Sequence, residues 1–299
     1  MDLIAFVNFY LVPGIILGSI YALGAVGVSL LFGILRFAHF AHGDLMTFGA
    51  YVTLTVVGVS GLSAFLALPI GIGAAVALAL LVNAAFYRPL KHLPTIVTVI
   101  SSFGIALMIR ASVQLIWGTD IESYRSGIQK PLILFDTFRI AERHIWIVLI
   151  TAGLIVLLHH FLARTKIGKA MRAVADDPAL ASVSGIDIEH VVRWVWVIGG
   201  GLAAVAGVFL GIDNQLHTNM GWDLLLPVFA AALLGGIGKP YGAIAGGYVI
   251  GIAQELSTYP WLGSTPFVDP GYKSAIAFGI LVVMLIWRPQ GLTRGRLFT

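Results

Sequence analysis

The stretch ARTKIGKAMRAVADDPALASVSGIDIEHVVR, residues 163–193, interrupts a chain that is otherwise mostly apolar. It holds five of the 18 lysine and arginine residues. On both sides of it lie apolar runs of about 20 residues, the length with which a helix crosses a bilayer. The sequence therefore predicts two sets of membrane spans joined by a polar segment on one membrane face.

Local signals inside this stretch predict a short helix held between two turns. Asp177 followed by Pro178 is typical of an N-cap with proline at the first helical position, where its missing N–H costs nothing. The helix is expected to end at about Ser184, because Gly185 readily adopts the left-handed conformation that stops a helix.

A second helix is expected to begin directly after this turn. Asp187 is placed as its N-cap, and Ile186 and Val191 are placed to form a hydrophobic staple across that cap. Two interpretations of the whole segment follow. It is either a solvated connector between two spans or a docking element for a soluble partner.

Composition identifies the class of protein. The 299 residues are 59% hydrophobic and 11% charged, against about 25% charged residues in a soluble domain. The net charge of +4 is small, and its basic residues lie in loops, which indicates membrane orientation and not nucleic-acid binding. The absence of cysteine excludes disulfides and thiolate chemistry. Asp2 stands where a signal peptide carries basic residues, so no cleaved signal is expected.

The fold expected is an all-α integral membrane bundle, a single domain over residues 1–299. Seven apolar segments are long enough to span the bilayer: Phe9–Leu35, Ala41–Val59, Leu62–Phe86, Pro94–Trp117, Ile145–Leu162, Val191–Gly211 and Tyr272–Trp287. A further pair, Asp223–Leu234 and Gly242–Leu256, is too short for confident spanning. It is expected to form a broken or re-entrant helix pair, giving about seven to nine segments in total.

Basic residues predict the orientation, because cytoplasmic loops carry an excess of them. With residues 163–193 inside, eleven basic residues are cytoplasmic: Arg36, Arg88, Lys91, Arg164, Lys166, Lys169, Arg172, Arg193, Arg288, Arg294 and Arg296. Five are then external: Arg125, Lys130, Arg139, Arg143 and Lys273. The N-terminus is accordingly expected outside and the C-terminus in the cytoplasm.

Small residues recur at helical spacing, which permits close helix contacts in lipid. The pairs are Gly14/Gly18, Gly207/Gly211, Gly242/Gly246 and Gly247/Gly251. Glycines also surround a proline in GGIGKPYG, residues 235–242, a composition that permits broken helices of the kind that line transport pathways. Gly235, Gly236 and Gly238 are therefore candidate pathway residues.

A second polar break, residues 36–44, contains His39, His42 and Asp44. The absence of a third clear ligand argues against a metal site. Asp44 is interpreted first as an N-cap for the following helix, and the alternative is a role of this turn in gating or substrate binding. Arg110 lies within a span and must face protein, water or a carboxylate partner, unless it reaches the membrane surface.

No phosphate-binding loop, nucleophile elbow or pair of carboxylates in one span is present, which argues against an enzyme. No cofactor is predicted. A self-sufficient secondary transporter or channel for a small polar solute remains an alternative. It would require ion-coupling or proton-relay residues inside the spans, where Arg110 is the only strong charge found.

In order along nearly the whole chain, short motifs resemble the permeases of branched-chain amino acid ATP-binding cassette (ABC) importers, and the LivH-type subunit more than the longer LivM type. The motifs are 21–27, 32–33, 40–44, 49–51, 87–90, 168–173, 177–178, 185–186, 234–238 with Pro240 and Gly242, and 288–292. One position departs from the family pattern: His39 stands where asparagine is usual.

The resemblance implies a non-catalytic translocation subunit of the bacterial inner membrane. Its implied partners are a second permease subunit, two cytoplasmic ATPases and a periplasmic solute-binding protein. Leu, Ile and Val are the implied substrates, with urea, amides or small aromatic acids as alternatives. Residues 163–190 would then form the coupling segment that contacts an ATPase, with these residues foremost: Lys169, Arg172, Asp176, Asp177, Pro178 and Gly185.

Overall fold

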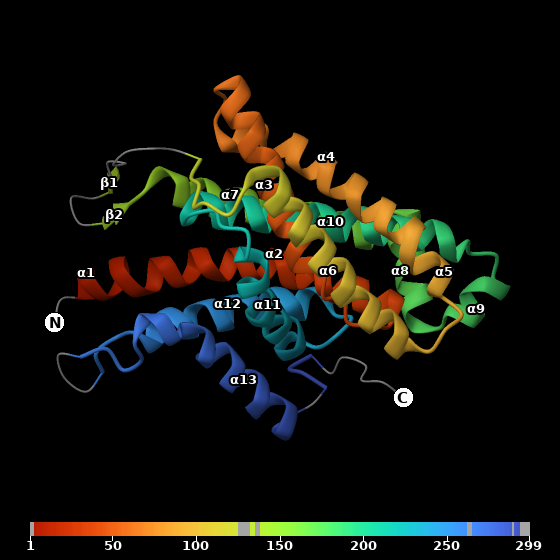
Figure 1. Ribbon diagram of the computed structural model, residues 1–299. Helices are drawn as coiled ribbons and strands as arrows, with labels where there is room; N and C mark the ends of the chain where they lie inside the picture. Colours follow the sequence, from red (N-terminus) through yellow and green to blue (C-terminus); the bar gives the residue numbers. More distant parts are fainter. Residues whose placement is uncertain (1–2, 125–131, 135–137, 262–264, 289, 294–299) are drawn as a thin grey trace.

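The computed structural model describes residues 3–124, 132–134, 138–261, 265–288 and 290–293. These residues form an elongated helical bundle with one small antiparallel hairpin (Figure 1). Six residues used in the sequence analysis lie outside the described ones: Asp2, Arg125, Lys130, Pro289, Arg294 and Arg296.

The longer helices confirm all seven predicted spans, because each is long and apolar enough to cross a membrane. Their main helices are α2 (Val12–Leu35), α3 (His42–Ser60), α4 (Ala64–Val82), α6 (Thr95–Trp117), α7 (Glu142–Arg164), α10 (Ile188–Asp213) and α13 (Lys273–Trp287). Adjoining short helical turns extend the spans of α2, α4 and α13. Two further helices, α11 (Met220–Gly235) and α12 (Pro240–Ser257), correspond to the predicted short pair.

Short elements complete the described chain. They are α1 (Leu3–Phe6), the π-helical turns Val7–Leu11 and Asn83–Tyr87, α5 (Arg88–Leu90), β1 (Leu132–Leu134), β2 (Phe138–Ile140), α8 (Lys166–Asp176), α9 (Pro178–Val183) and the 3-10 turn Pro270–Tyr272. The hairpin β1–β2 and α1 lie at one end of the bundle, which we call the hairpin end (Figure 1). Helices α5, α8 and α9 lie at the opposite end, the α9 end (Figure 1).

The bundle is built around α2 and α10, which are buried over most of their length, whereas α7 and α13 lie on its outside. Helix α12 packs along α2. A side chain at Gly251 would clash with the backbone of Gly18, and one at Gly247 would clash with the backbone of Ala22. The prediction that these glycines mediate close helix contacts is confirmed, because only a missing side chain allows two backbones to approach so closely.

Helices α11 and α12 are joined by a tight turn at the α9 end. Gly236 and Gly238 have positive φ angles of 104° and 74°, which glycine adopts without steric cost. Gly238 lies against Gly33, near the end of α2. The turn is also contacted by the chain's last described residues, since the Leu292 N–H donates to the Leu234 carbonyl (2.8 Å).

The segment between α2 and α3 turns back into the bundle. Helix α2 ends where Arg36 adopts a left-handed conformation with φ 58°. A Cβ at Gly27 would lie 2.8 Å from the ring of His42, and Gly27 precedes the last residue of α2, Leu35, by roughly 12 Å of helix. Helix α3 therefore begins inside the bundle and not at its surface.

Candidate functional site

The polar segment at residues 163–193 forms helices α8 and α9, the turns on either side of α9, and the start of α10. Thr165 caps α8 by accepting a hydrogen bond from the Gly168 N–H at 3.0 Å. Gly168, Met171 and Val174 are buried and recur every third residue, so they form the face of α8 that packs on the bundle. The sequence analysis missed α8, although this spacing and the threonine cap are signals that could have identified it.

Helix α9 begins as predicted. The Asp177 side chain accepts hydrogen bonds from the N–H groups of Ala179 (2.9 Å) and Leu180 (3.0 Å). Pro178 occupies the first helical position, and its ring fixes a φ angle already suited to the helix. Two of the N–H groups that a helix start leaves unpaired are thus satisfied by one carboxylate.

Helix α9 also ends as predicted. The Ile186 N–H donates to the Ala181 carbonyl and the Gly185 N–H to the Ser182 carbonyl, both at 3.0 Å. Gly185 has a φ of 83°. Together these features form a Schellman motif, the hydrogen-bonded stop in which a left-handed residue reverses the chain.

The third predicted cap is present at the start of α10. The Asp187 side chain accepts a hydrogen bond from the His190 N–H at 3.1 Å. Val191 is buried and Ile186 packs against the same core, as a hydrophobic staple requires. Helix α9 is therefore fixed at both ends and anchored to a long membrane helix.

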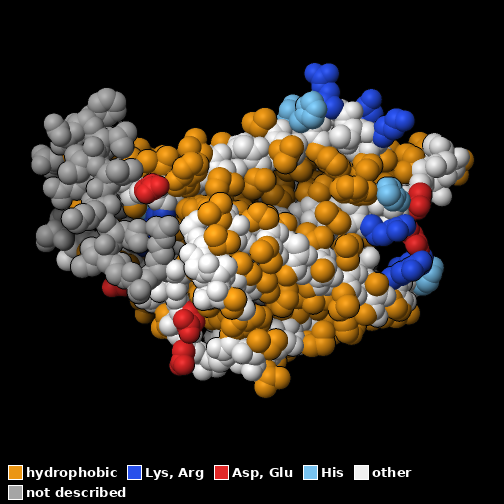
Figure 2. Space-filling model, turned by 90° about the horizontal axis from the view of Figure 1, so that it is seen from above, with side chains coloured by type: hydrophobic (Ala, Val, Ile, Leu, Met, Phe, Trp, Pro, Cys, Tyr) orange, Lys and Arg blue, Asp and Glu red, His pale blue; other side chains and the backbone are white. Residues whose placement is uncertain are grey.

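Two apolar side chains of this fixed helix point away from the bundle. Leu180 is 65% exposed and Val183 is 88% exposed, one helical turn apart, while Ala181 is buried. Helix α9 lies at the tip of the α9 end of the bundle (Figure 1). In Figure 2, lysine, arginine and histidine side chains gather toward that end, whereas hydrophobic side chains cover the middle of the visible face.

A cavity of about 290 Å³ connects the coupling segment with the α11–α12 turn. Arg172 and Asp176 of α8 line one side, and Gly238 and Lys239 line the other. Lys169 is exposed on the same helix. The structure thus places two groups of predicted residues, one for coupling and one for the pathway, next to each other at the α9 end.

The pathway residues predicted in the segment 36–44 lie elsewhere, inside the bundle. His39 is buried, its Nδ1 is 2.9 Å from the Tyr87 hydroxyl, and its ring meets the Trp196 ring edge to face at 4.9 Å between centroids. His42 is buried against Gly27. The six predicted pathway residues therefore form two separate groups and not a single site.

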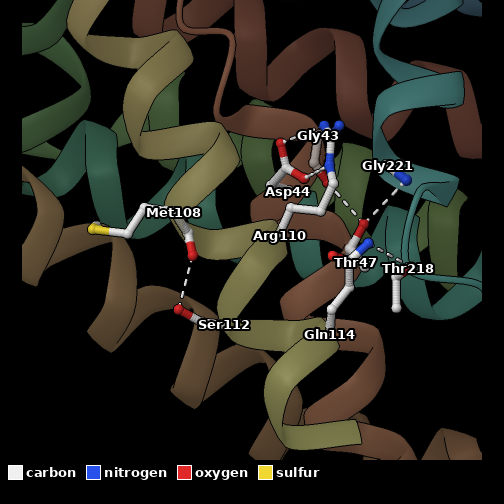
Figure 3. Close-up of polar contacts among 9 residues, drawn as sticks. All are labelled: Gly43, Asp44, Thr47, Met108, Arg110, Ser112, Gln114, Thr218 and Gly221. Carbon is white, nitrogen blue, oxygen red and sulfur yellow. Dashed lines mark hydrogen bonds and ion pairs between the residues drawn. The ribbon is translucent and has the colours of Figure 1, made fainter. Parts of the chain in front are cut away.

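Asp44 does not act as a helix cap, which corrects the first interpretation of this residue. The N-cap position of α3 is Ala41, and Asp44 lies within the first helical turn. Its carboxylate instead binds Arg110 of α6, from Nε to Oδ1 at 2.9 Å and from Nη2 to Oδ2 at 3.1 Å (Figure 3). Asp44 is not a cap because α3 begins inside the bundle, where Arg110 of α6 lies close enough to bind its carboxylate.

The ion pair also identifies what the charge of Arg110 faces inside the membrane span. Of the partners considered for this intramembrane charge, the structure provides a carboxylate. Asp44 is 1% exposed and Arg110 14% exposed. A bidentate pair between two helices neutralises both charges in an apolar region, where an isolated charge would be costly.

Further polar contacts surround this pair (Figure 3). The Thr47 hydroxyl accepts a hydrogen bond from the Gly221 N–H at 3.0 Å, and the Gln114 side-chain amide donates to the Thr218 hydroxyl at 3.3 Å. These contacts hold the start of α11 against α3 and α6. The sequence analysis singled out none of these four residues for function, because their spacing in sequence carries no motif.

The fold and these features define a multi-pass helical membrane protein. A solved structure, PsaBC from Streptococcus pneumoniae in complex with Fab, shares the fold with a TM-score of 0.53. The alignment covers 96% of this chain and 95% of that one at 14% sequence identity. At this identity the similarity concerns the fold alone.

Sequence comparison identifies the family. The family model described as the permease component of the branched-chain amino acid transport system matches residues 10–285, so the chain belongs to that family. The permease protein BraD of Pseudomonas aeruginosa is 30% identical over 94% of both chains. LivH of Escherichia coli K12 is 30% identical over 93% of this chain and 92% of LivH. LivM of the same organism is 23% identical over 92% of this chain and 68% of LivM.

Proposed function

We propose that this chain is a translocation subunit of an ABC importer that carries Leu, Ile and Val, or related small solutes, across the bacterial inner membrane. Its family membership supports the substrate class, since BraD and LivH are named as high-affinity branched-chain amino acid permeases. The structural observation that carries the proposal is helix α9, a capped helix that presents Leu180 and Val183 outward.

The geometry of α9 fits a partner-docking element better than a connector. A helix of six residues is too short to be stable by itself in water, yet here hydrogen-bonded caps hold both of its ends. If residues 163–193 are cytoplasmic, Leu180 and Val183 face water. Their burial in a protein partner would be favourable, at about 1.5–3 kcal/mol for a fully buried side chain of this size.

In this proposal the partner at α9 is a cytoplasmic ATPase, which performs the ATP hydrolysis that drives transport. The coupling residues are those predicted from sequence: Lys169, Arg172, Asp176, Asp177, Pro178 and Gly185. A second permease subunit completes the membrane part, a second ATPase serves that subunit, and a periplasmic binding protein delivers the solute. The cavity between α8 and the α11–α12 turn is lined by Arg172, Asp176 and Gly238, so the coupling segment lies next to the turn that carries the candidate pathway glycines.

Replacement of Leu180 and Val183 by serine tests the docking role. Because both side chains point outward, the double variant is expected to reach the membrane in normal amounts. It should lose co-purification of the ATPases and, with it, uptake of labelled leucine by the reconstituted complex. Ser182→Ala, on an exposed position of the same helix, is the matched control and should behave as the unmodified protein. Normal co-purification of the ATPases with the double variant would contradict the docking role.

The orientation proposed here places the N-terminus outside and the C-terminus in the cytoplasm. Single cysteines at two exposed positions, Lys169 in α8 and Asp120 just after α6, test it in this cysteine-free chain. An impermeant thiol reagent added to intact cells permeable only at the outer membrane should label position 120 and not position 169. Labelling of position 169 under these conditions would reverse the orientation.

A further inference from the structure

Arg110 has unused binding capacity in the middle of the molecule. A guanidinium group has five N–H donors, and Asp44 accepts from two of them, one on Nε and one on Nη2. Within the described part of the chain, Asp44 is the hydrogen-bond partner found for Arg110. Three N–H donors, including both on Nη1, therefore remain for another acceptor.

These donors lie at membrane depth. Arg110 precedes the last residue of α6, Trp117, by roughly 10 Å of helix. The Asp44 carboxylate is almost fully buried, whereas the Arg110 side chain retains 14% of its exposure. Asp44 thus fixes the guanidinium from the inside of the bundle and leaves its outer edge accessible.

An aromatic surface adjoins that edge. The Arg110 guanidinium carbon is 5.0 Å from the centroid of the Trp222 ring. Phe103 lies next to Trp222 and stacks on Phe40 with 4.0 Å between ring centroids, and Phe40 stacks in turn on Phe229 at 5.4 Å. Trp222 and Phe103 are 39% and 37% exposed. The three elements α6, α11 and the segment 36–41 together form this surface.

Contact with lipid would be unfavourable for a surface that contains these free donors. Unpaired guanidinium donors facing hydrocarbon are costly, so intramembrane arginines face water-filled cavities, substrate pathways or partners. The combination of an anchored cation and a broad aromatic face matches a ligand that carries one carboxylate and an aliphatic side chain. A guanidinium can bind a carboxylate through two parallel hydrogen bonds.

Building on the proposed importer function, we propose that Arg110 binds the α-carboxylate of the amino acid during its passage through the membrane. Asp44 is the positioning residue that orients the guanidinium. Trp222, Phe103 and Phe40 provide the apolar surface for the substrate's aliphatic side chain. The site accounts for an ion pair that joins residues 66 positions apart yet leaves one partner only partly satisfied.

The test uses the complete complex with its ATPases and binding protein in proteoliposomes, and labelled leucine. The key variant is the double replacement Arg110→Met with Asp44→Leu, which removes both charges and leaves no unpaired carboxylate behind. Replacing an ion pair by apolar residues of similar size is often neutral for stability. We expect normal assembly and ATP hydrolysis stimulated by loaded binding protein as in the unmodified complex. Leucine uptake should fall about tenfold or more, the effect of losing a charge-assisted hydrogen bond to the substrate.

A second variant, Arg110→Lys, keeps the charge opposite Asp44 and loses the planar set of donors. It should assemble normally and also take up leucine more slowly, with a raised KM. Ser112→Ala, two residues further along α6 and so on a different side of the helix, is the matched control. Among the described residues, its hydroxyl donates to the Met108 carbonyl of its own helix (2.8 Å; Figure 3).

Wild-type uptake by the double variant would overturn the proposal and leave the pair a purely structural contact. Failure of both variants to assemble would also overturn it, since the pair would then serve folding. An unmodified complex that hydrolyses ATP but imports none of Leu, Ile and Val would instead refute the branched-chain importer function itself. The unmodified complex is therefore measured first.

Discussion

Replacement of Gly185 by valine is expected to abolish substrate uptake while the protein remains in the membrane at its normal level. Gly185 has a φ of 83°, and a non-glycine residue in the left-handed region costs about 1–2 kcal/mol, more when it is β-branched. A Cβ at this position would meet no atom within 4 Å. The effect is therefore confined to the backbone conformation that ends α9.

This local cost is large for α9 and small for the bundle. The Schellman hydrogen bonds of Gly185 and Ile186 hold the C-terminal end of a helix of only six residues. Once they are lost, the helix cannot keep Leu180 and Val183 in fixed positions against an ATPase. The measurements are ATPase co-purification, ATP hydrolysis stimulated by loaded binding protein, and leucine uptake in the same proteoliposomes.

Gly185→Asn is the matched control for this variant. Asparagine tolerates the left-handed conformation better than other non-glycine residues, so this variant should keep most of the uptake. Equal uptake by the valine variant and the unmodified protein would show that α9 is a connector. Equal losses in the valine and asparagine variants would show that the backbone conformation is not what matters.

Replacement of Gly251 by leucine is expected to prevent accumulation of folded protein. A side chain here would collide with the backbone of Gly18 on α2, and a backbone cannot move aside as a flexible side chain can. Overpacking a close contact costs about 1–3 kcal/mol, and more where backbones must separate. Because α2 lies at the centre of the bundle, separating α12 from it disturbs many other contacts.

Gly153→Leu on α7 is the control for this second variant. A Cβ at Gly153 would meet nothing within 4 Å, so leucine there should extend into free space and leave folding intact. The amount of monodisperse protein in mild detergent, measured by size-exclusion chromatography, reports the outcome for both variants. Comparable yields from both would mean that the α2–α12 contact does not hold the fold together.

The glycine pairs at helical spacing show what the sequence alone does not predict. Gly247 and Gly251 share the spacing of a helix-packing motif, and the structure confirms their role. Gly207 and Gly211 show the same spacing and are also packed, Gly207 against the backbone of Met46. Which helix each pair meets, however, is not encoded in the spacing. It depends on how all the helices pack together.

The sequence by itself determined the features that depend on neighbouring residues. Length and hydropathy gave all seven long spans, because the bilayer selects apolar segments one at a time. Asp177, Gly185 and Asp187 gave the start and stop of α9 and the start of α10, because a cap binds backbone groups only two or three residues away. These predictions are confirmed residue by residue.

Only the tertiary structure decided the features that join distant residues. It turned Asp44 from an expected cap into the partner of Arg110, 66 residues away, and placed Trp222 beside that pair. It also brought α8 against the α11–α12 turn. The physical reason is that an ion pair or a ring contact depends on distances in space. Those distances arise only when helices from both halves of the chain have packed around α2.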